Sequence, residues 1–230
     1  MKVKHLVGAF LCVLGCYACS SPKTEVQSPD GHIKMTLTVD ENGKPFYNVS
    51  VDDSLLIENS AMGFTAANGI ILGEGFQVKN TTFSSEDETW TQPWGENKKN
   101  RNHYNEMAVN LTNEDHVQLT LRFRVFDDGI GFRYEYTVPT VDSLLITDEL
   151  TTFRFHRDGT SWSIPASAET YELLYQQQPI SEVETANTPF TFKTADGVYG
   201  SIHEAALYDF PEMTLKQIGH YTLKAELAPW

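Results

Sequence analysis

The first residue to suggest chemistry is Glu204, in the stretch GVYGSIHEAALYDFP over residues 197–211. If this stretch is a β-strand, its side chains alternate between two faces. Glu204 then shares a face with Val198 and Ile202, which are expected to point into a core. Burying a carboxylate is costly unless it is paired, hydrogen-bonded or bound to a metal. Three interpretations follow: a salt bridge, a strand end in solvent, or a ligand to a hard cation such as calcium.

A second concentration of polar residues is SSEDETWTQPWGENKKNRNHYNEM, residues 84–107. We interpret it as a long loop, the part of a sandwich where binding residues concentrate. Its tryptophans can stack on a sugar ring or anchor the loop to the sandwich. Together with His203, the candidates for contact with a substrate or a partner domain are Trp90, Trp94, Glu96, Asn102, His103, Asn105 and Glu106.

The stretch RFHRDGTSWSIPASAETYE, residues 154–172, gathers His156, Arg157, Asp158 and Trp162. A catalytic carboxylate pair needs two acids roughly 5 to 10 Å apart, and the spacing here selects no pair. The sequence has no nucleophile elbow, Gly-rich phosphate loop or His-x-x-x-His zinc pair. No motif in the chain makes a complete active site.

The elements that position these residues follow a period of two, typical of half-buried strands. Apolar and polar residues alternate in the predicted strands, which are hairpins at 32–51 and 190–202, strands at 116–126 and 130–138, and a strand at 220–227. The best helical candidate is the short segment 167–178. The fold class is therefore all-β, a large antiparallel β-sandwich (super-sandwich) with little helix, in one domain over residues 30–230.

The chain carries 17 basic and 31 acidic residues among 230, a formal net charge of −14. Nucleic acids and anionic membranes repel such a surface. We therefore exclude nucleic acid as a partner, and expect contact with a membrane only through a lipid anchor.

Residues 1–19 have the pattern of an export leader, with MKVKH followed by an apolar run too short to span a bilayer. We expect lipidation at Cys19, with a tether over 20–29; Cys16 is the competing site, and an ordinary cleaved signal peptide is the alternative. All three cysteines lie in this leader, so we expect no disulfide and no thiolate metal site in the exported part. The expected location is the periplasm or, through a lipid anchor, the bacterial outer membrane.

Six segments occur in this order along the chain: SPDG, WGENKKNRNHYNEM, FDDGIGFRYEY, WSIPASAETYE, SIHEAALYDFPEM and LAPW. Together they resemble the N-terminal domain of glycoside hydrolase family 97. The resemblance implies a sandwich packed against a (β/α)8 barrel that cleaves α-linked oligosaccharides as an exo-acting α-glucosidase or α-galactosidase. It also implies a calcium ion at the barrel mouth, with Glu204 as the ligand from the sandwich.

The resemblance places the catalytic acid and base on the barrel, and the sequence ends at Trp230, before the barrel would begin. A truncated reading frame, a gene fragment and one half of a split enzyme are all compatible with this. No catalytic residue carries over, and we expect this chain alone to be inactive. The alternative is a stand-alone, lipid-anchored carbohydrate-binding sandwich that stacks sugars on Trp90, Trp94 and Trp162.

Overall fold

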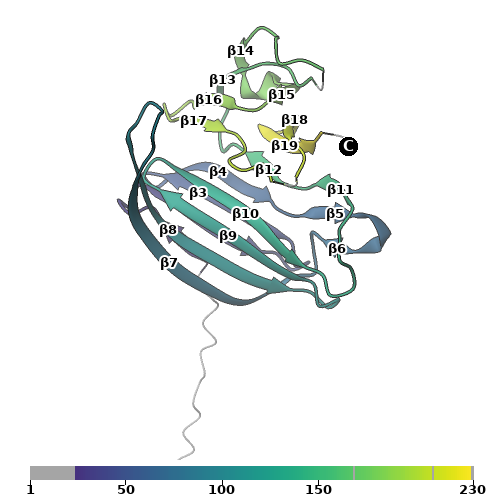
Figure 1. Ribbon diagram of the computed structural model, residues 1–230. Helices are drawn as coiled ribbons and strands as arrows, with labels where there is room; N and C mark the ends of the chain where they lie inside the picture. The colour runs from purple at the N-terminus through teal and green to yellow at the C-terminus, as the bar shows by residue number, and fades with distance from the viewer. Residues whose placement is uncertain (1–23, 168, 209, 229–230) are drawn as a thin grey trace, which may run out of the picture.

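The computed structural model describes residues 24–167, 169–208 and 210–228. The predicted leader, with Cys16 and Cys19, lies outside the described residues. Figure 1 shows a curved pair of sheets built mainly from the first ten strands, with a smaller group of strands, β11–β19, on one side of it. Helix is limited in the described chain to two three-residue 3₁₀ turns, η1 and η2. The predicted all-β architecture is confirmed.

Two four-stranded antiparallel sheets form what we call the first sandwich. One sheet has the order β1 (Glu25–Gln27), β2 (Ile33–Val39), β3 (Pro45–Val51) and β4 (Ser54–Ala61). The other has the order β10 (Gly129–Thr137), β9 (Gln118–Phe126), β8 (Lys99–Thr112) and β7 (Gln77–Thr91). Alternate side chains of both sheets meet in a core that includes Met35, Leu37, Tyr47, Met107, Leu121 and Phe123.

A short three-stranded sheet flanks the first sandwich. Its order is β11 (Ile146–Glu149), β5 (Phe64–Ala66) and β6 (Ile71–Leu72), and η1 (Ala67–Gly69) joins β5 to β6. The ring of Phe64 packs against that of Tyr134 in β10, with centroids 4.7 Å apart. This packing fixes β11, and the acid at its end, against the first sandwich.

Two further antiparallel sheets form the second sheet pair. One has the order β12 (Thr152–Arg154), β19 (Thr222–Leu227), β18 (Met213–Gly219) and β15 (Thr185–Asn187). The other has the order β14 (Gln176–Pro179), β13 (Gly159–Ser163), β16 (Phe190–Thr194) and β17 (Tyr199–Ile202), with η2 (Ile180–Glu182) after β14. Phe155 packs edge-on against Phe192, with centroids 4.8 Å apart, and also forms a β-bridge with Ile57 of β4. The two parts therefore share one continuous core.

The predicted hairpins and strands at 32–51, 116–138, 190–202 and 220–227 are confirmed by β2–β3, β9–β10, β16–β17 and β19. β1 lies inside the segment 20–29 that we expected to be a tether, and it pairs with β2. Within the part of the chain that the structure describes, no helix has the length and apolar character of a membrane span.

One predicted element was wrong, and the best helical candidate is not a helix. The segment 167–178 is not helical where it is described, and its end forms β14, which pairs with β13. Residues 84–107 are not a long loop, because β7 and β8 pair from Gln77↔Thr112 to Thr91↔Lys99 and leave only a short turn. Most side chains of β7 are exposed, which explains why the strand has the polar sequence of a loop.

Gly200 in β17 shows why one position of the hairpin at 190–202 has no side chain. A Cβ at Gly200 would lie 2.4 Å from Cζ of Phe192, directly across the ladder. The buried Phe192 ring therefore occupies the space beside Gly200. The opposite face of the same strand carries Tyr199 and Ser201, both exposed.

Candidate functional site

Glu204 lies just beyond the end of β17 and is half-buried. The strand ends at Ile202, as predicted for the hairpin at 190–202, so Glu204 lies beyond it. The Thr188 hydroxyl donates a hydrogen bond to Oε2 of Glu204 at 2.6 Å, and the Met213 backbone N–H donates to Oε1. No lysine or arginine pairs with Glu204 among the described residues. The carboxylate is thus held in place by neutral donors, without a positively charged partner.

A second acid, Glu149, is buried near Glu204. Thr151 donates a hydrogen bond to Glu149 at 2.6 Å, and the Thr151 hydroxyl also contacts the Tyr134 hydroxyl at 2.6 Å. Burial raises the pKa of Glu149, and the negative charges of Glu204 and Asp148 add to the rise. Glu204 is therefore close enough for its charge to act on Glu149.

Tyr171 and Glu212 extend this acidic region. The Tyr171 hydroxyl donates a hydrogen bond to Oε1 of Glu212. This bond raises the pKa of the Tyr171 phenol, and the charge of Glu204 adds to the rise. Lys224 binds Asp148 at 2.7 Å, and its positive charge opposes the rise in the pKa of Glu149.

Exposed apolar side chains lie in the two segments that flank these acids, 171–175 and 207–210. We call them the apolar rim, which consists of Tyr171, Leu173, Leu174, Tyr175, Leu207, Tyr208 and Phe210. Leu174 is 90% exposed and Tyr208 is 85% exposed. Large apolar side chains so fully in contact with water are typical of a surface that another protein segment covers.

The acids near Glu204 do not make a complete cation site. Within the described ranges, no group of three or more His, Cys, Asp or Glu side chains is arranged to hold a metal ion. Calcium takes about six to eight oxygen ligands, usually including several carboxylates. Glu204 suits the role of one such ligand, because its oxygens keep lone pairs beyond the two bonds that orient it. The residues present are therefore compatible with one carboxylate ligand of a calcium site whose other ligands come from outside the described residues.

The other predicted contact residues lie elsewhere. Trp94, which is 85% exposed, and Glu96 are at the turn between β7 and β8. The Asn105 amide donates to the Gln27 carbonyl at 2.9 Å and ties β8 to β1. Neither an ion pair nor a hydrogen bond of the described residues joins these side chains to Glu204. His203 is next to it in sequence, exposed, with Nδ1 2.8 Å from the Glu204 carbonyl.

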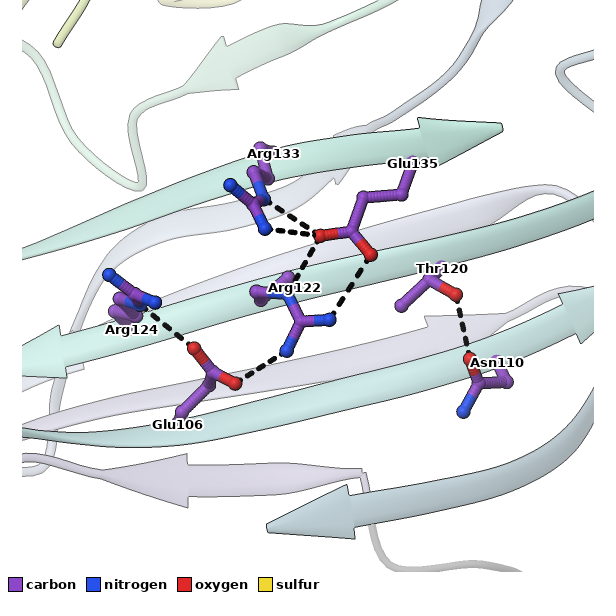
Figure 2. A network of polar contacts seen from close by, with 7 residues as sticks. All are labelled: Glu106, Asn110, Thr120, Arg122, Arg124, Arg133 and Glu135. Carbon is purple, nitrogen blue, oxygen red and sulfur yellow. Dashed lines mark hydrogen bonds and ion pairs between the residues drawn. The ribbon is translucent and has the colours of Figure 1, made fainter. Parts of the chain in front are cut away.

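Glu106 belongs to an ion-pair network on the outer face of the β8–β9–β10 sheet (Figure 2). Its carboxylate accepts hydrogen bonds from Arg122 at 2.5 Å and from Arg124 at 2.8 Å, and Arg122 also binds both oxygens of Glu135. Burial opposes ionisation of Glu106, but the bonds from the two arginines prevail and lower its pKa. Both carboxylate oxygens of Glu106 are hydrogen-bonded to partners within the sheet, so the side chain has a structural role.

The cluster in 154–172 likewise forms structural contacts. His156 Nδ1 lies 2.7 Å from a carboxylate oxygen of Glu58, and Arg157 binds Asp196 at 2.9 Å. Asp158 accepts two hydrogen bonds from Ser181, at the start of η2. Only Trp162 of this group is left on an outer sheet face.

Sequence reasoning missed Thr188, Met213 and Glu149 as neighbours of Glu204. Thr188 follows β15 and Met213 begins β18, and these two strands are neighbours in one sheet. No local pattern marks these positions, because their contact with Glu204 depends on the pairing of strands distant in sequence.

Fold and site together define an all-β sandwich module that presents one incomplete acidic site beside an exposed apolar rim. Residues 26–230 match the family model described as Glycosyl-hydrolase 97 N-terminal. The chain belongs to this family, and it is the N-terminal domain.

The proteins of known structure or function that are similar to this chain include glycosidases. The chain is 25% identical, over 93% of its length, to a retaining alpha-galactosidase of Bacteroides thetaiotaomicron and spans 33% of that protein. It is 38% identical, with a TM-score of 0.83, to a glycoside hydrolase family 97 enzyme of Pseudoalteromonas sp. strain K8 in complex with panose, covering 90% of this chain and 32% of that one. A beta-arabinopyranosidase at 21% identity and a TM-score of 0.79, covering 89% of this chain and 35% of that one, shows the fold alone. The chain spans about a third of the length of these relatives.

Proposed function

We propose that this chain is the N-terminal accessory domain of a calcium-dependent, exo-acting α-glycosidase, an α-glucosidase or an α-galactosidase. The named relatives support an α-linked oligosaccharide as substrate, since one is an alpha-galactosidase and another binds panose. Because the chain spans about a third of these relatives, the catalytic acid and base are assigned to a (β/α)8 barrel outside it. The apolar rim is the surface that this barrel would cover.

The observation that carries the proposal is the environment of Glu204. An unpaired, half-buried carboxylate is unfavourable unless something compensates its charge. Two neutral donors, Thr188 and Met213, orient the group but bring no positive charge. A cation shared with the barrel would supply this charge.

The residues of this chain have a positioning role in the proposed reaction. A calcium ion held by Glu204 and by ligands of the barrel would supply positive charge to the active site. Thr188 and Met213 hold the Glu204 carboxylate in one orientation, so that little side-chain freedom is lost when it binds. The apolar rim would exclude water where the two domains meet.

The proposal includes export of the protein. The leader, with lipidation at Cys19 or Cys16, would place the domain in the periplasm or on the outer membrane. Radiolabelled palmitate incorporated into the wild-type chain and lost in Cys19→Ala would support the anchor at Cys19. Loss in Cys16→Ala alone would move the anchor to that residue, and no incorporation would leave an ordinary signal peptide.

Calcium binding to the purified chain tests whether its site is incomplete. Calorimetric titration should give a dissociation constant of about 1 mM or weaker, outside the range of dedicated closed sites. Micromolar binding that Glu204→Gln abolishes would show that the chain holds a complete site. Glu226→Gln is the matched control, because the Glu226 side chain is 41% exposed and pairs with Lys216. The chain alone should not hydrolyse aryl α-glucosides or α-galactosides.

A chimera tests the shared site directly. The chain replaces the corresponding N-terminal third of the Pseudoalteromonas enzyme, and calcium affinity is measured by equilibrium dialysis alongside hydrolysis. Glu204→Gln should weaken calcium binding about tenfold or more, the scale on which even outer-shell groups change metal affinity. Glu226→Gln should leave it unchanged. Equal calcium affinity in the wild-type and Glu204→Gln chimeras would refute the assignment.

A further inference from the structure

Two aromatic rings lie side by side on the outer face of the β14–β13–β16–β17 sheet. Trp162 of β13 and Tyr199 of β17 have ring centroids 6.4 Å apart and planes inclined by 15°. The Lys193 ammonium of β16, the strand between them, lies 5.0 Å from the centre of the Tyr199 ring. Three strands therefore contribute to one aromatic surface.

The strand register places these side chains opposite the core. Ser161, Phe192 and Gly200 form a row across the three strands on the inner face. The neighbouring rows, on the outer face, are Trp162–Thr191–Ser201 and Thr160–Lys193–Tyr199. Tyr199 is 64% exposed. Trp162 is half-buried. Neither ring is enclosed in the core, and an aromatic pair on an outer sheet face, with one ring largely exposed, points to a binding role.

Polar side chains surround the two rings on this face. They are Thr160, Gln177, Thr191, Lys193 and Ser201, which carry hydroxyl, amide and ammonium groups. This pattern differs from the apolar rim, whose exposed side chains are leucines and aromatics. A protein partner is therefore better matched by the apolar rim, and the outer sheet face suits a ligand that is apolar on one side and rich in hydroxyls at its edge.

Pyranose sugars have this character. The C–H groups on one face of the ring pack on an aromatic ring, while the equatorial hydroxyls reach hydrogen-bonding groups beside it. The formal net charge of −14 disfavours polyanionic ligands. The face is supported by strand backbone, and Lys193 packs over one ring, so little order has to be gained on binding.

We propose that the outer face of the β14–β13–β16–β17 sheet is a carbohydrate-binding surface for neutral pyranose oligosaccharides, with Trp162 and Tyr199 as the stacking platform. This surface is distinct from Glu204 and its neighbours. It binds sugar without cleaving it and holds the protein on a glycan. If this surface does not bind sugar, the role proposed for Glu204 is unaffected, and if Glu204 does not bind calcium, the sugar-binding proposal is unaffected.

The test is calorimetric titration of the full chain with maltoheptaose and, separately, with cellohexaose, which together distinguish α-linked from β-linked chains. Binding of either should be weakened about three- to tenfold by Tyr199→Ala, as expected for the loss of one aromatic stacking contact. Tyr199→Phe keeps the ring and should retain the affinity. Tyr208→Ala removes an equally exposed tyrosine of the apolar rim and should bind as the wild type does.

Trp162→Ala should weaken binding in the same way, with its circular dichroism compared with that of the wild type. If this variant does not fold, Tyr199→Ala decides, because a side chain so exposed can be removed with little effect on stability. No binding of either sugar at millimolar concentration would overturn the proposal. So would full affinity in Tyr199→Ala, loss of binding in Trp94→Ala instead, or a dimer that Tyr199→Ala dissociates.

Discussion

Replacing Glu106 by glutamine tests whether the ion-pair network in Figure 2 stabilises the first sandwich. The Glu106 side chain is 10% exposed and is bound by Arg122, which is 26% exposed, and by Arg124, which is 44% exposed. Glutamine preserves the shape and one acceptor oxygen but removes the charge. The change therefore isolates the charge in a side chain that is largely out of water.

The size of the effect follows from what each arginine loses. Hydrogen bonds to charged groups contribute roughly 1.5 to 3 kcal/mol each, and a fully buried charge left without its partner costs about 3 to 5 kcal/mol. Arg122 keeps its two bonds to Glu135, and Arg124 can turn to water. We therefore expect Glu106→Gln to lower the free energy of unfolding by about 1 to 3 kcal/mol.

Urea unfolding followed by fluorescence measures this loss. The matched control is Glu226→Gln, whose pair with Lys216 is exposed on both sides and should cost about 0 to 1 kcal/mol. The effect at Glu106 should persist in about 1 M salt, because partly buried pairs are only weakly screened. A loss below about 0.5 kcal/mol, or one no larger than in the control, would refute the reasoning.

Three further outcomes are expected. The pKa of Glu106 in the folded protein lies below its usual value of 4.5. The stabilisation by the ionised Glu106 carboxylate is therefore complete above pH 4.5 and is lost as the pH falls through the pKa of the folded state. The free energy of unfolding of Glu106→Gln should accordingly depend less on pH in this acid range than that of the wild type. Gly200→Ala should lower the free energy of unfolding by about 1 to 3 kcal/mol, because the added Cβ meets the buried Phe192 ring. Gly131→Ala is the control and should be nearly neutral, because no atom lies within 4 Å of its added Cβ. Thermal unfolding of the two variants measures the difference. Tyr47→Phe should cost about 0.5 to 1.5 kcal/mol in urea unfolding, because it removes a buried hydroxyl that donates at 2.9 Å to a backbone carbonyl of β12, and an unchanged midpoint would contradict this.

The strands that could be predicted from sequence are those with one solvent-exposed face and one buried face. In β9, Leu119, Leu121, Phe123 and Val125 are buried, and the residues between them are more exposed. That alternation is visible in the sequence and needs no knowledge of the neighbours. In β7 most side chains are exposed, so no alternation marks the strand, and only its pairing with β8 makes it extended.

The position of Glu204 was only partly predictable. The alternation is confirmed over Tyr199–Ile202 by β17, and it extrapolates to Glu204 as the next core-facing residue. The hydrogen-bonded pairing of β16 with β17 ends before it reaches Glu204. Its last pair is Ile202 with Phe190, and the residue before Phe190 is a proline, which has no N–H to donate. The chain is then free to turn Glu204 toward donors supplied by other strands, which a sequence pattern cannot specify.

β7 forms an open edge of the first sandwich over 15 residues, with β8 as its single neighbour among the described strands. Such an edge presents unpaired backbone groups that another chain can join. Glu86, Asp87 and Glu88 follow one another along it. Asp87 is paired with Arg101, but Glu86 and Glu88 have no basic partner among the described residues, so two molecules approaching edge to edge would bring these like charges together. The acidity of this strand therefore gives the protein a built-in resistance to joining its own copies into longer sheets.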